Sequence, residues 1–450
     1  MTIPPTAGYS GPPIDACATD SAPPLAADVV VIGGGIVGMS TALALAERGV
    51  SVVLCEKGAL AAEQSSRNWG WVRKMGRDPR EMPLMLESMR IWDRLQEGGL
   101  HLGFRRSGIV YLCATAHELA RRTAWLERVH EFQLDSRLLA PADIGRVLPG
   151  LGGQWIGALH TASDGRAEPQ KAVPALARRA RELGAKIVTQ CAVRGIETKA
   201  GRVAAAVTER GTIACGSVVL AGGAWSRLFC RNLDLTLPQL KVIASVMRVD
   251  GVSGGPESAA LSSGFAFRKR ADGGYTVTGG TGTTADIVPD SFRFFRMFLP
   301  LAAAERRHTR LRLGPRFIEE LRQPARWRLD AVSPFERVRI LDPQPAHTHL
   351  EAGLRNLQTV FPAFKGATIR QSWAGAIDAT PDAIPVISAV DGLPGLHIAT
   401  GFSGHGFGIG PGAGRLMADI VTGRQPIVDP SAFRFSRFSD GSRLEFFTGL

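Results

Sequence analysis

The stretch from residue 28 to residue 57, DVVVIGGGIVGMSTALALAERGVSVVLCEK, constrains the fold of this chain more than any other. It opens with the apolar, β-branched run Val29–Ile32, which is typical of a buried strand. Three glycines follow at the spacing G-x-G-x-x-G: Gly33, Gly35 and Gly38. A helical pattern then runs from Ile36 to Arg48, and a second apolar strand, Val50–Leu54, leads to Glu56. This order predicts a βαβ unit of an α/β fold.

The residue types of this unit also predict a ligand. Gly33 permits a tight turn, Gly35 lets the backbone approach a pyrophosphate, and Gly38 lets the helix pack closely on the sheet. The helix N-terminus offers N–H groups and a partial positive charge to phosphates. Glu56 lies where a carboxylate can accept hydrogen bonds from ribose hydroxyls. We therefore expect a dinucleotide, and the motif alone leaves FAD and NAD open.

Two later stretches repeat this pattern. Residues 217–229, SVVLAGGAWSRLF, read as a buried strand, a glycine turn and a short helix. The strand pattern Leu396–Ala399 is followed by the glycine-rich turn 400–414 and a helix that ends near Thr422. Glycine turns at helix N-termini suit a negatively charged ligand. Three such elements in one chain indicate that all of them wrap one large dinucleotide.

The composition describes an ordinary globular protein. The chain has 450 residues, enough for two domains, with 45% hydrophobic and 21% charged residues. Its net charge of +12 comes mostly from scattered arginines, which favours a solvated basic surface and leaves an anionic substrate, an acidic partner or a membrane surface open. No basic run is interleaved with aromatic residues, so we expect no nucleic-acid partner.

The cysteines and the termini bear on the compartment. The six cysteines are dispersed, form no C-x-x-C pair and have no metal-ligand spacing, which indicates reduced thiols, a cytoplasmic protein and no metal site. No apolar run approaches the length of a membrane-spanning helix. Residues 1–27 are rich in Pro, Ala and Thr and lack an apolar signal core, so we expect a disordered tail and no targeting peptide.

The pattern of elements predicts two interleaved domains. Strand-like runs at 241–249, 265–269 and 275–278, with the hairpin signal Asp272-Gly273-Gly274, predict a mixed sheet accompanied by helices at 291–306 and 350–361. We assign residues 28–80, 161–231 and 365–425 to the dinucleotide-binding domain, and residues 81–160 and 232–364 to a substrate domain of α+β character. Residues 426–450 form a C-terminal tail or strap.

These motifs together resemble a known family. The N-terminal glycine motif, VVLAGGAWS, WAG followed by TPDAIPVI, and ATGFSGHGFG occur in the order found in the D-amino-acid oxidase superfamily of FAD enzymes, which includes glycine oxidase, sarcosine oxidase and D-amino-acid dehydrogenases. The resemblance covers residues 28–437. It implies a Rossmann-like FAD-binding domain with an interleaved substrate domain, oxidation of the C–N bond of an amine or amino acid, and a flavin ring at the domain boundary.

The resemblance also implies which residues contact FAD. The N-terminal glycines would hold the pyrophosphate, Glu56 the adenosine ribose, and the turn at Gly404–Gly408 the pyrimidine end of the flavin. The full set is Gly33, Gly35, Ile36, Val37, Gly38, Glu56, Lys57, Ser65, Ser66, Arg67, Asn68, Trp69, Gly70, Val193, Ala221, Gly222, Trp225, Gly375, Gly404, His405, Gly406, Phe407 and Gly408.

The chain departs from the family pattern at two points. Glycine oxidase and its relatives carry an arginine after W-A-G that grips the substrate carboxylate, and here Ile377 and Asp378 occupy that region. Asp378 would instead attract a cationic amine, or Arg73, Arg268 or another arginine would take over the carboxylate. The loss tilts the expectation toward N-substituted amino acids or secondary amines. Members with covalent flavin use a cysteine near residue 370, and no cysteine follows Cys230, so we expect non-covalent FAD.

The resemblance implies hydride transfer from the substrate carbon to flavin N5, followed by hydrolysis of the imine. We expect Arg73, Trp373, Asp378 and His405 to line the substrate face. The electron acceptor is O2, or a quinone or partner protein if the chain is a dehydrogenase subunit of a larger complex. A homo-oligomer stays open. An NAD(P)-dependent dehydrogenase is the third alternative, disfavoured by the C-terminal glycine turn.

Overall fold

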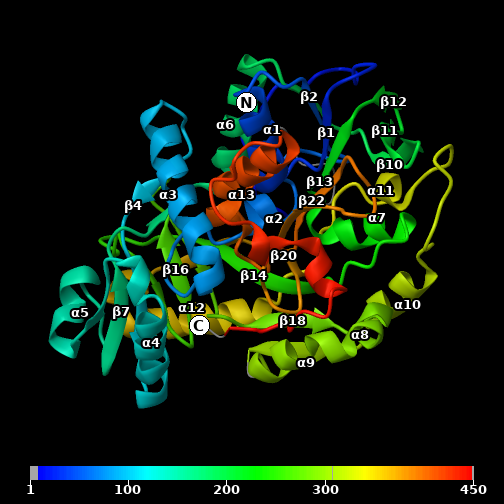
Figure 1. The fold of residues 1–450 in the computed structure, drawn as a ribbon. Coiled ribbons are helices and arrows are strands. Elements are labelled where there is room, and N and C mark those ends of the chain that lie inside the picture. Colours follow the sequence, from blue (N-terminus) through cyan, green and yellow to red (C-terminus); the bar gives the residue numbers. More distant parts are fainter. Residues whose placement is uncertain (1–8, 307, 448–450) are drawn as a thin grey trace.

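The computed structural model describes residues 9–306 and 308–447 (Figure 1). A six-stranded sheet has the order β21-β22-β13-β1-β2-β9, in which every pair is parallel except β21 with β22. Its strands are β1 (Val29–Ile32), β2 (Val52–Cys55), β9 (Lys186–Val188), β13 (Ser217–Leu220), β21 (Val386–Ala389) and β22 (Leu396–Thr400). The predicted βαβ unit is confirmed, and the segments at 217–220 and 396–400 join the same sheet.

Both faces of this sheet are covered, which explains why its strands are apolar at every position. Val29 and Val31 face a core that includes three helices, whereas Val30 and Ile32 face a three-stranded antiparallel sheet and a short helix. The helices are α1 (Ile36–Ala46), α6 (Pro169–Glu182) and α13 (Gly406–Val421), and the other face carries β10 (Val193–Lys199), β11 (Arg202–Thr208), β12 (Gly211–Ala214) and α7 (Ser226–Asn232).

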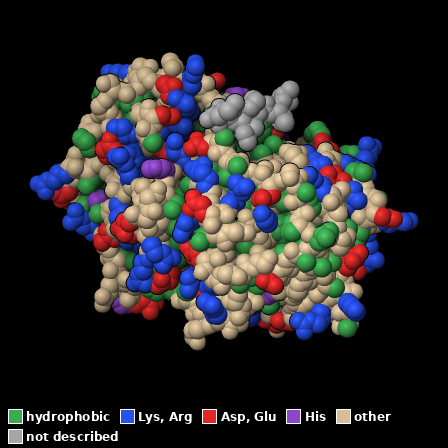
Figure 2. Space-filling view, turned by 90° about the horizontal axis from the view of Figure 1, so that it is seen from above, with side chains coloured by type: hydrophobic (Ala, Val, Ile, Leu, Met, Phe, Trp, Pro, Cys, Tyr) green, Lys and Arg blue, Asp and Glu red, His purple; other side chains and the backbone are tan. Residues whose placement is uncertain are grey.

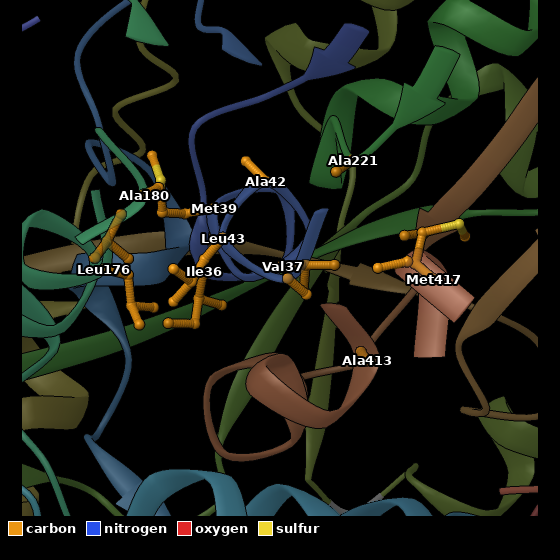
Figure 3. Close-up of a cluster of buried hydrophobic side chains, with 14 of the residues drawn as sticks. Ile36, Val37, Met39, Ala42, Leu43, Leu176, Ala180, Ala221, Ala413 and Met417 are labelled. Carbon is orange, nitrogen blue, oxygen red and sulfur yellow. The ribbon is translucent and has the colours of Figure 1, made fainter. Parts of the chain in front are cut away.

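Helix α1 is the centre of the helical layer. All of its residues are buried, and it packs against α6 and α13. Figure 3 shows Leu176 and Ala180 of α6 on one side of α1 and Met417 of α13 on the other. Helix α3 (Met82–Glu97) packs on α13 and closes the layer. The helix that carries the glycine motif is therefore held from several directions.

A second, ten-stranded sheet is mixed, as the sequence predicted. Its order is β19-β18-β14-β17-β16-β15-β5-β7-β6, with β20 paired to β14. The strands are β5 (Ile109–Cys113), β6 (Ser136–Leu139), β7 (Gly157–Thr161), β14 (Leu240–Asp250), β15 (Ala259–Leu261), β16 (Ala266–Lys269), β17 (Tyr275–Thr278), β18 (Thr283–Asp286), β19 (Thr309–Arg312) and β20 (Thr368–Ala379). The hairpin predicted at residues 272–274 joins β16 to β17 and is confirmed.

The remaining elements surround these sheets. Helices α4 (Ala116–Arg128), α5 (Pro141–Val147) and α12 (His347–Val360) accompany the large sheet. The helix expected over 291–306 is divided at Phe294 into α8 (Pro289–Arg293) and α9 (Phe295–Ala304), which lie below β18 in Figure 1 near α10 (Pro315–Arg322). Short elements are α2 (Gln64–Arg67), β3 (Trp71–Val72), the 3-10 turn η1 (Pro79–Glu81), β4 (Arg105–Arg106), β8 (Gly165–Arg166) and α11 (Pro334–Arg337). The domain boundaries given above stay a prediction.

The N-terminal segment differs from the expectation of a disordered tail. Residues 9–27 follow a defined path, and residues 1–8 lie outside the described part of the chain. The backbone N–H of Ser10 donates to Asp342 at 2.7 Å, and Asp20 and Ala27 bond to the backbone of Ile187 and Ala214. The prolines prevent a helix, but they leave backbone groups free to bond to the folded surface.

The C-terminal segment is a strap in its described part, residues 426–447. Phe433 is buried in the core of the helical layer. Nε of Arg437 donates to a carboxylate oxygen of Asp382 at 2.9 Å, and both side chains are almost wholly buried. The strap therefore contributes a buried ion pair to the same body as the glycine motif.

The described surface fits the prediction of scattered charge. On the face in Figure 2, Lys and Arg side chains are intermingled with Asp and Glu side chains. No helix in the described part of the chain combines the length and the apolar character needed to cross a membrane.

The strap generates a testable prediction. Arg437→Ala leaves Asp382 buried without its partner, so we expect a loss of about 3–5 kcal/mol in the free energy of unfolding, measured by urea titration with tryptophan fluorescence. The control is Arg434→Ala, whose partner Asp440 is partly exposed and which should cost at most about 1 kcal/mol. Equal losses in the two variants would contradict a structural role for the strap.

Candidate active site

Three glycine turns from distant parts of the chain line one cleft at the carboxyl edge of the six-stranded sheet. The cleft is bordered by Gly33–Gly35 after β1, Ala221–Gly223 after β13, and Gly404 and Gly406 at the start of α13. Parallel strands end at the same edge of a sheet, so the turns that follow β1, β13 and β22 converge. A single extended ligand can therefore contact all three.

The turns meet by direct backbone approach. Gly33 has φ +108, and a Cβ added to it would lie 2.5 Å from the carbonyl oxygen of Ala221. A Cβ on Gly38 would lie 2.1 Å from the carbonyl oxygen of Gly33. No other residue type fits at these two positions without moving the backbone. Gly38 thus packs α1 onto the turn, as predicted, and does not itself line the cleft.

Glu56 and Ser65 give the cleft its polar groups near α1. One carboxylate oxygen of Glu56 accepts the N–H of Gly34 at 2.7 Å, and the other accepts the N–H of Gly58 at 2.7 Å. Burial raises the pKa of Glu56 above its ordinary value. The hydroxyl of Ser65 accepts the N–H of Ile36 at 2.9 Å, which places it at the N-terminus of α1. Phosphate oxygens and ribose hydroxyls are the groups that such a donor and acceptor set suits.

Most of the residues expected at the cofactor line this first cleft. They are Gly33, Gly35, Ile36, Val37, Glu56, Lys57, Ser65, Asn68, Val193, Ala221, Gly222, Trp225, Gly404, Gly406 and Phe407. Arg67, Trp69, His405 and Gly408 line a second cavity instead. Gly38, Ser66, Gly70 and Gly375 lie in the wall of neither, and the three glycines pack against backbone or side chains behind it.

Several residues of the first cleft were missed by sequence analysis. Glu63 lies between Lys57, at 2.7 Å from Nζ, and the indole N–H of Trp225, which donates at 3.0 Å. Phe335 and Arg339 also line the cleft, although they belong to a range assigned to the substrate domain. No local pattern marks these positions, since only the path of the segment 323–346 brings them to the sheet edge. Gly34 and Gln64, beside the motif residues, are the other notable additions.

A second cavity of about 660 Å³ adjoins the first cleft. Gln64, Asn68, Gly404 and Phe407 border both spaces. Strand β20 separates them further along, because its side chains alternate between two faces: Ala376 and Asp378 line the first cleft, whereas Ile377 and Ala379 line the second cavity. A ligand in the cleft and a ligand in the cavity would meet at the shared border.

Charged side chains gather at one end of this cavity, where the loop after β3 faces the start of α13. They are Arg73, Arg77, Glu81 and His405. Nη1 of Arg73 donates to the carbonyl of Met75, and the guanidinium of Arg77 donates to the carbonyls of Arg73, at 3.2 Å, and His405, at 3.3 Å. These bonds run to carbonyls and not to carboxylates. Nη1 of Arg77 is buried and has no partner among the described residues.

The electrostatics of this cluster are unbalanced. Burial, followed by repulsion from Arg73, lowers the pKa of Arg77 to about 10, and Glu81 opposes this shift. Burying a cation without a paired anion is costly. An anionic ligand in the cavity would reduce that cost.

The rest of the cavity wall is largely apolar. It includes Trp71, Leu240, Val242, Val246, Leu261, Phe295, Phe298, Leu299 and Ile377. Ile377 stands where the resembling enzymes carry an arginine, and its side chain does face the cavity. The wall also carries Lys241, Asp286, Glu305 and Arg306. A largely apolar wall with a cationic pair such as Arg73 and Arg77 suits a ligand that has a bulky apolar part and an anionic part.

Two residues expected on the substrate face, Trp373 and Asp378, do not line the second cavity, and neither does Arg268, one of the alternatives for the carboxylate. Trp373 is fully buried, and its indole N–H donates to the carbonyl of Arg67 at 3.0 Å, about four residues along β20 from the cavity wall at Ile377. Asp378 points to the opposite face of β20, where its carboxylate accepts the N–H of Gly401 at 2.7 Å. Arg268 is buried in an ion pair with Glu168 at 2.8 Å. Arg73 and His405 do line the cavity.

Comparison with known proteins identifies the family of the chain. Residues 28–420 match the family of FAD-dependent oxidoreductases called DAO. The chain belongs to this family. Its fold is the FAD-binding fold of the DAO enzymes, and the chain is an FAD-dependent oxidoreductase.

Solved structures in the family give strong matches. The L-amino acid deaminase from Proteus myxofaciens, in complex with anthranilate, has a TM-score of 0.91 and 37% identity over 95% of this chain and 96% of that chain. The L-amino acid deaminase from Proteus vulgaris has a TM-score of 0.90 and 34% identity, over 94% and 100% of the two chains.

Curated relatives are more distant. Glycine oxidase from Pseudomonas putida is 25% identical over 90% of this chain and 97% of its own length. Mouse sarcosine dehydrogenase is 24% identical over 92% of this chain, but the chain spans only 42% of that protein.

The residues of the first cleft fit FAD. The cleft is continuous from Glu56, which suits a ribose, past the N-terminus of α1, which suits the pyrophosphate, to Gly406 and Phe407 beside the second cavity. FAD, when bound, supplies an acceptor for a hydride at that border. The N-terminus of α13 begins at Gly406 and would stabilise negative charge there.

Glu56 provides a test of the cleft. The wild-type carboxylate of Glu56 accepts two backbone N–H groups, and in Glu56→Gln the side-chain NH2 would face one of them, donor against donor. We therefore expect the dissociation constant for FAD to rise at least about tenfold, equivalent to about 1.4 kcal/mol. The measurement is fluorescence titration of apoprotein, which also tests whether FAD is non-covalent. Glu47→Gln, an exposed change at the other end of α1, is the control. Equal affinities would remove Glu56 from the cofactor site.

Proposed function

We propose that the chain oxidises the C–N bond of α-amino acids of the L configuration that carry bulky apolar side chains. The imine product would hydrolyse to an oxo acid and ammonia. The observation that carries this proposal is the pair Arg73 and Arg77, two buried cations without ion-pair partners among the described residues, in a largely apolar cavity beside the flavin cleft. The names and identities of the two Proteus enzymes support the L configuration.

Arg73 and Arg77 are the proposed site for the substrate carboxylate. A guanidinium presents paired N–H groups that match a carboxylate. The carboxylate of the substrate would add negative charge beside Arg77, where Glu81 only partly offsets the burial of the guanidinium and its repulsion from Arg73. Arginine at this loop would replace the arginine that the resembling enzymes carry at the position of Ile377. The substrate is then held from the loop after β3 and not from β20.

The apolar wall would select substrates by their side chain and exclude water. Phe295 and Phe298 of α9 and Leu240 of β14 line the same cavity. A substrate oriented by its carboxylate would place its side chain against them, because the polar end is already occupied. The expectation of N-substituted amino acids as substrates rested on the missing arginine at residue 377. A carboxylate site at Arg73 and Arg77 would make that arginine unnecessary.

Arg73 gives the test of substrate class. We expect flavin bleaching without oxygen by L-amino acids such as leucine or phenylalanine, and weak bleaching by D-amino acids, N-methyl amino acids and polyamines. In Arg73→Ala, kcat/KM for the best L-amino acid should fall about 100-fold, since about 1.5–3 kcal/mol of charge-assisted hydrogen bonding is lost. Rates with amines that lack a carboxylate should not fall. Arg146→Ala, at an exposed arginine, is the control. Equal flavin bleaching by compounds with and without a carboxylate would contradict the proposal.

The electron acceptor is a second question, and one observation favours a quinone or partner protein over O2. Exposed apolar side chains cluster on α8, α9, β19 and α10 and the segments between them: Phe292, Phe295, Leu299, Leu311, Leu313, Ile318 and Leu321. Phe292, Phe295 and Leu299 also line the second cavity. Apolar surface of this kind marks a contact site. We propose that an apolar acceptor reaches the cavity there.

This proposal predicts turnover without peroxide. Aerobic oxidation of the substrate should yield little H2O2, measured with a peroxidase assay, and a water-insoluble quinone analogue should support turnover. Leu313→Ser with Leu321→Ser, two exposed positions of this cluster outside the cavity wall, should slow turnover with the quinone analogue several-fold but leave flavin bleaching by the substrate unchanged. One H2O2 for every substrate oxidised would instead identify an oxidase.

A further inference from the structure

Glu81 and His405 form a hydrogen-bonded pair at the charged end of the second cavity. Glu81 ends the turn η1, and His405 directly precedes α13. Nδ1 of His405 lies 3.0 Å from a carboxylate oxygen of Glu81. The side chain of Glu81 is 0% exposed and that of His405 is 16% exposed. The carboxylate thus lies behind the imidazole, which is the member of the pair that a ligand can reach.

The position of His405 matches the position of a reacting substrate. Its neighbours Gly404 and Gly406 line the flavin cleft, while His405 itself lines the second cavity. Gly404 and Phe407 border both spaces, so His405 stands where they meet. A substrate whose α-carbon faces the flavin, with its carboxylate at Arg73 and Arg77, must place its amino group close to this border.

The protonation states of the pair suit a base. Burial lowers the pKa of His405 below its ordinary value, and repulsion from Arg77 and Arg73 adds to this shift, while Glu81 opposes it. Burial alone would raise the pKa of Glu81, but His405, Arg77 and Arg73 outweigh it and hold that pKa low. The carboxylate is therefore charged and the imidazole neutral near pH 7. A charged carboxylate accepts the proton on Nδ1, which leaves the lone pair on Nε2.

We propose that His405 is the base that removes a proton from the substrate ammonium group, and that Glu81 is the positioning residue that fixes its tautomer. This inference rests on the proposed function, because it requires an amino acid as substrate. One N–H bond of the ammonium breaks, its proton moves to Nε2 of His405, and the electron pair stays on nitrogen. That lone pair would then be available to form the C=N bond, and FAD, when bound, would supply the acceptor for the hydride of the α-carbon. Glu81 stabilises the imidazolium that results.

The step answers a chemical need. An amino group is mostly protonated at neutral pH, with an ordinary pKa of about 8 in peptides, and a protonated nitrogen has no lone pair to form an imine. Arg73 and Arg77 also favour the neutral amine, because their positive charge repels an ammonium group. The competing explanation for deprotonation of the substrate is therefore this positive charge alone, without any base. The charged groups that interact electrostatically with His405 and Glu81 are these two arginines. Tyr111 of β5 interacts electrostatically with Arg77.

The experiment is the pH dependence of flavin reduction by an L-amino acid in anaerobic stopped flow, with wild-type protein, His405→Gln and Glu81→Gln. For wild type, kcat/KM should rise with pH through an acid limb below pH 6.5, where His405 becomes neutral. For His405→Gln this limb should vanish, and the rate near pH 7 should fall about 100-fold. The deficit should shrink above pH 9, because the solvent then delivers the neutral amine.

Glu81→Gln tests the positioning role. Loss of the carboxylate removes the charge that stabilises imidazolium, so the acid limb should move to lower pH while the rate falls less than in His405→Gln. The dissociation constant of an α-methyl amino acid, which binds but has no α-hydrogen to lose, should change less than about threefold in both variants. His160→Gln, a buried histidine of β7 outside both cavity walls, is the matched control and should keep the wild-type profile.

The outcomes separate the two proposals. The base assignment would be overturned if kcat/KM of His405→Gln fell by the same factor at every pH, or if its pH profile were unchanged. Neither result would affect the proposed substrate class. If His405→Gln does not bind FAD, the base assignment is tested with Glu81→Gln alone. A shift of its acid limb to lower pH supports the His405–Glu81 pair, and an acid limb at the wild-type pH overturns it. Wild-type flavin that no amino acid reduces would defeat the proposed function itself.

Discussion

The structure depends on backbone-to-backbone contact at two glycines. Gly38 allows α1 to rest on the carbonyl of Gly33, and Gly33 in turn allows the turn after β1 to rest on Ala221 after β13. A Cβ at either position would separate these elements. Helix α1 is then enclosed by α6 and α13, so the N-termini of α1 and α13 open onto the same edge of the sheet. The FAD cleft is the space that this packing leaves.

Strand β20 extends this constraint to the substrate. It pairs with β14 along the large sheet, and its alternating side chains form the border between the cofactor cleft and the cavity. A one-residue shift in register would exchange the two faces and put Asp378 into the apolar cavity. Asp378 prevents that shift locally, since its carboxylate is held by the N–H of Gly401. Its role is to position the turn before α13.

The two arginines at the charged end of the cavity differ from other buried arginines in their hydrogen-bond partners. Arg437, Arg268 and Arg67 each have a carboxylate partner, as most buried arginines require. Arg73 and Arg77 donate instead to carbonyls. Within the described ranges, the fold thus concentrates positive charge where the cavity meets the cleft. This arrangement connects the packing of the loop after β3 to the recognition of an anionic substrate.

The sequence by itself determined the βαβ unit and the three glycine turns, because these rest on local conformation: strands, helix N-termini and positions where a Cβ does not fit. The choice of FAD over NAD came from the resemblance to a family and not from local conformation. It also identified Arg73 and His405 as candidates. It failed for Trp373 and Asp378, since the direction of a side chain on a strand depends on register and on the elements that cover it. Only the tertiary structure brought Arg77 and Glu81 to His405, across 324 residues in the case of Glu81, because burial and charge balance arise between segments and leave no mark in either one.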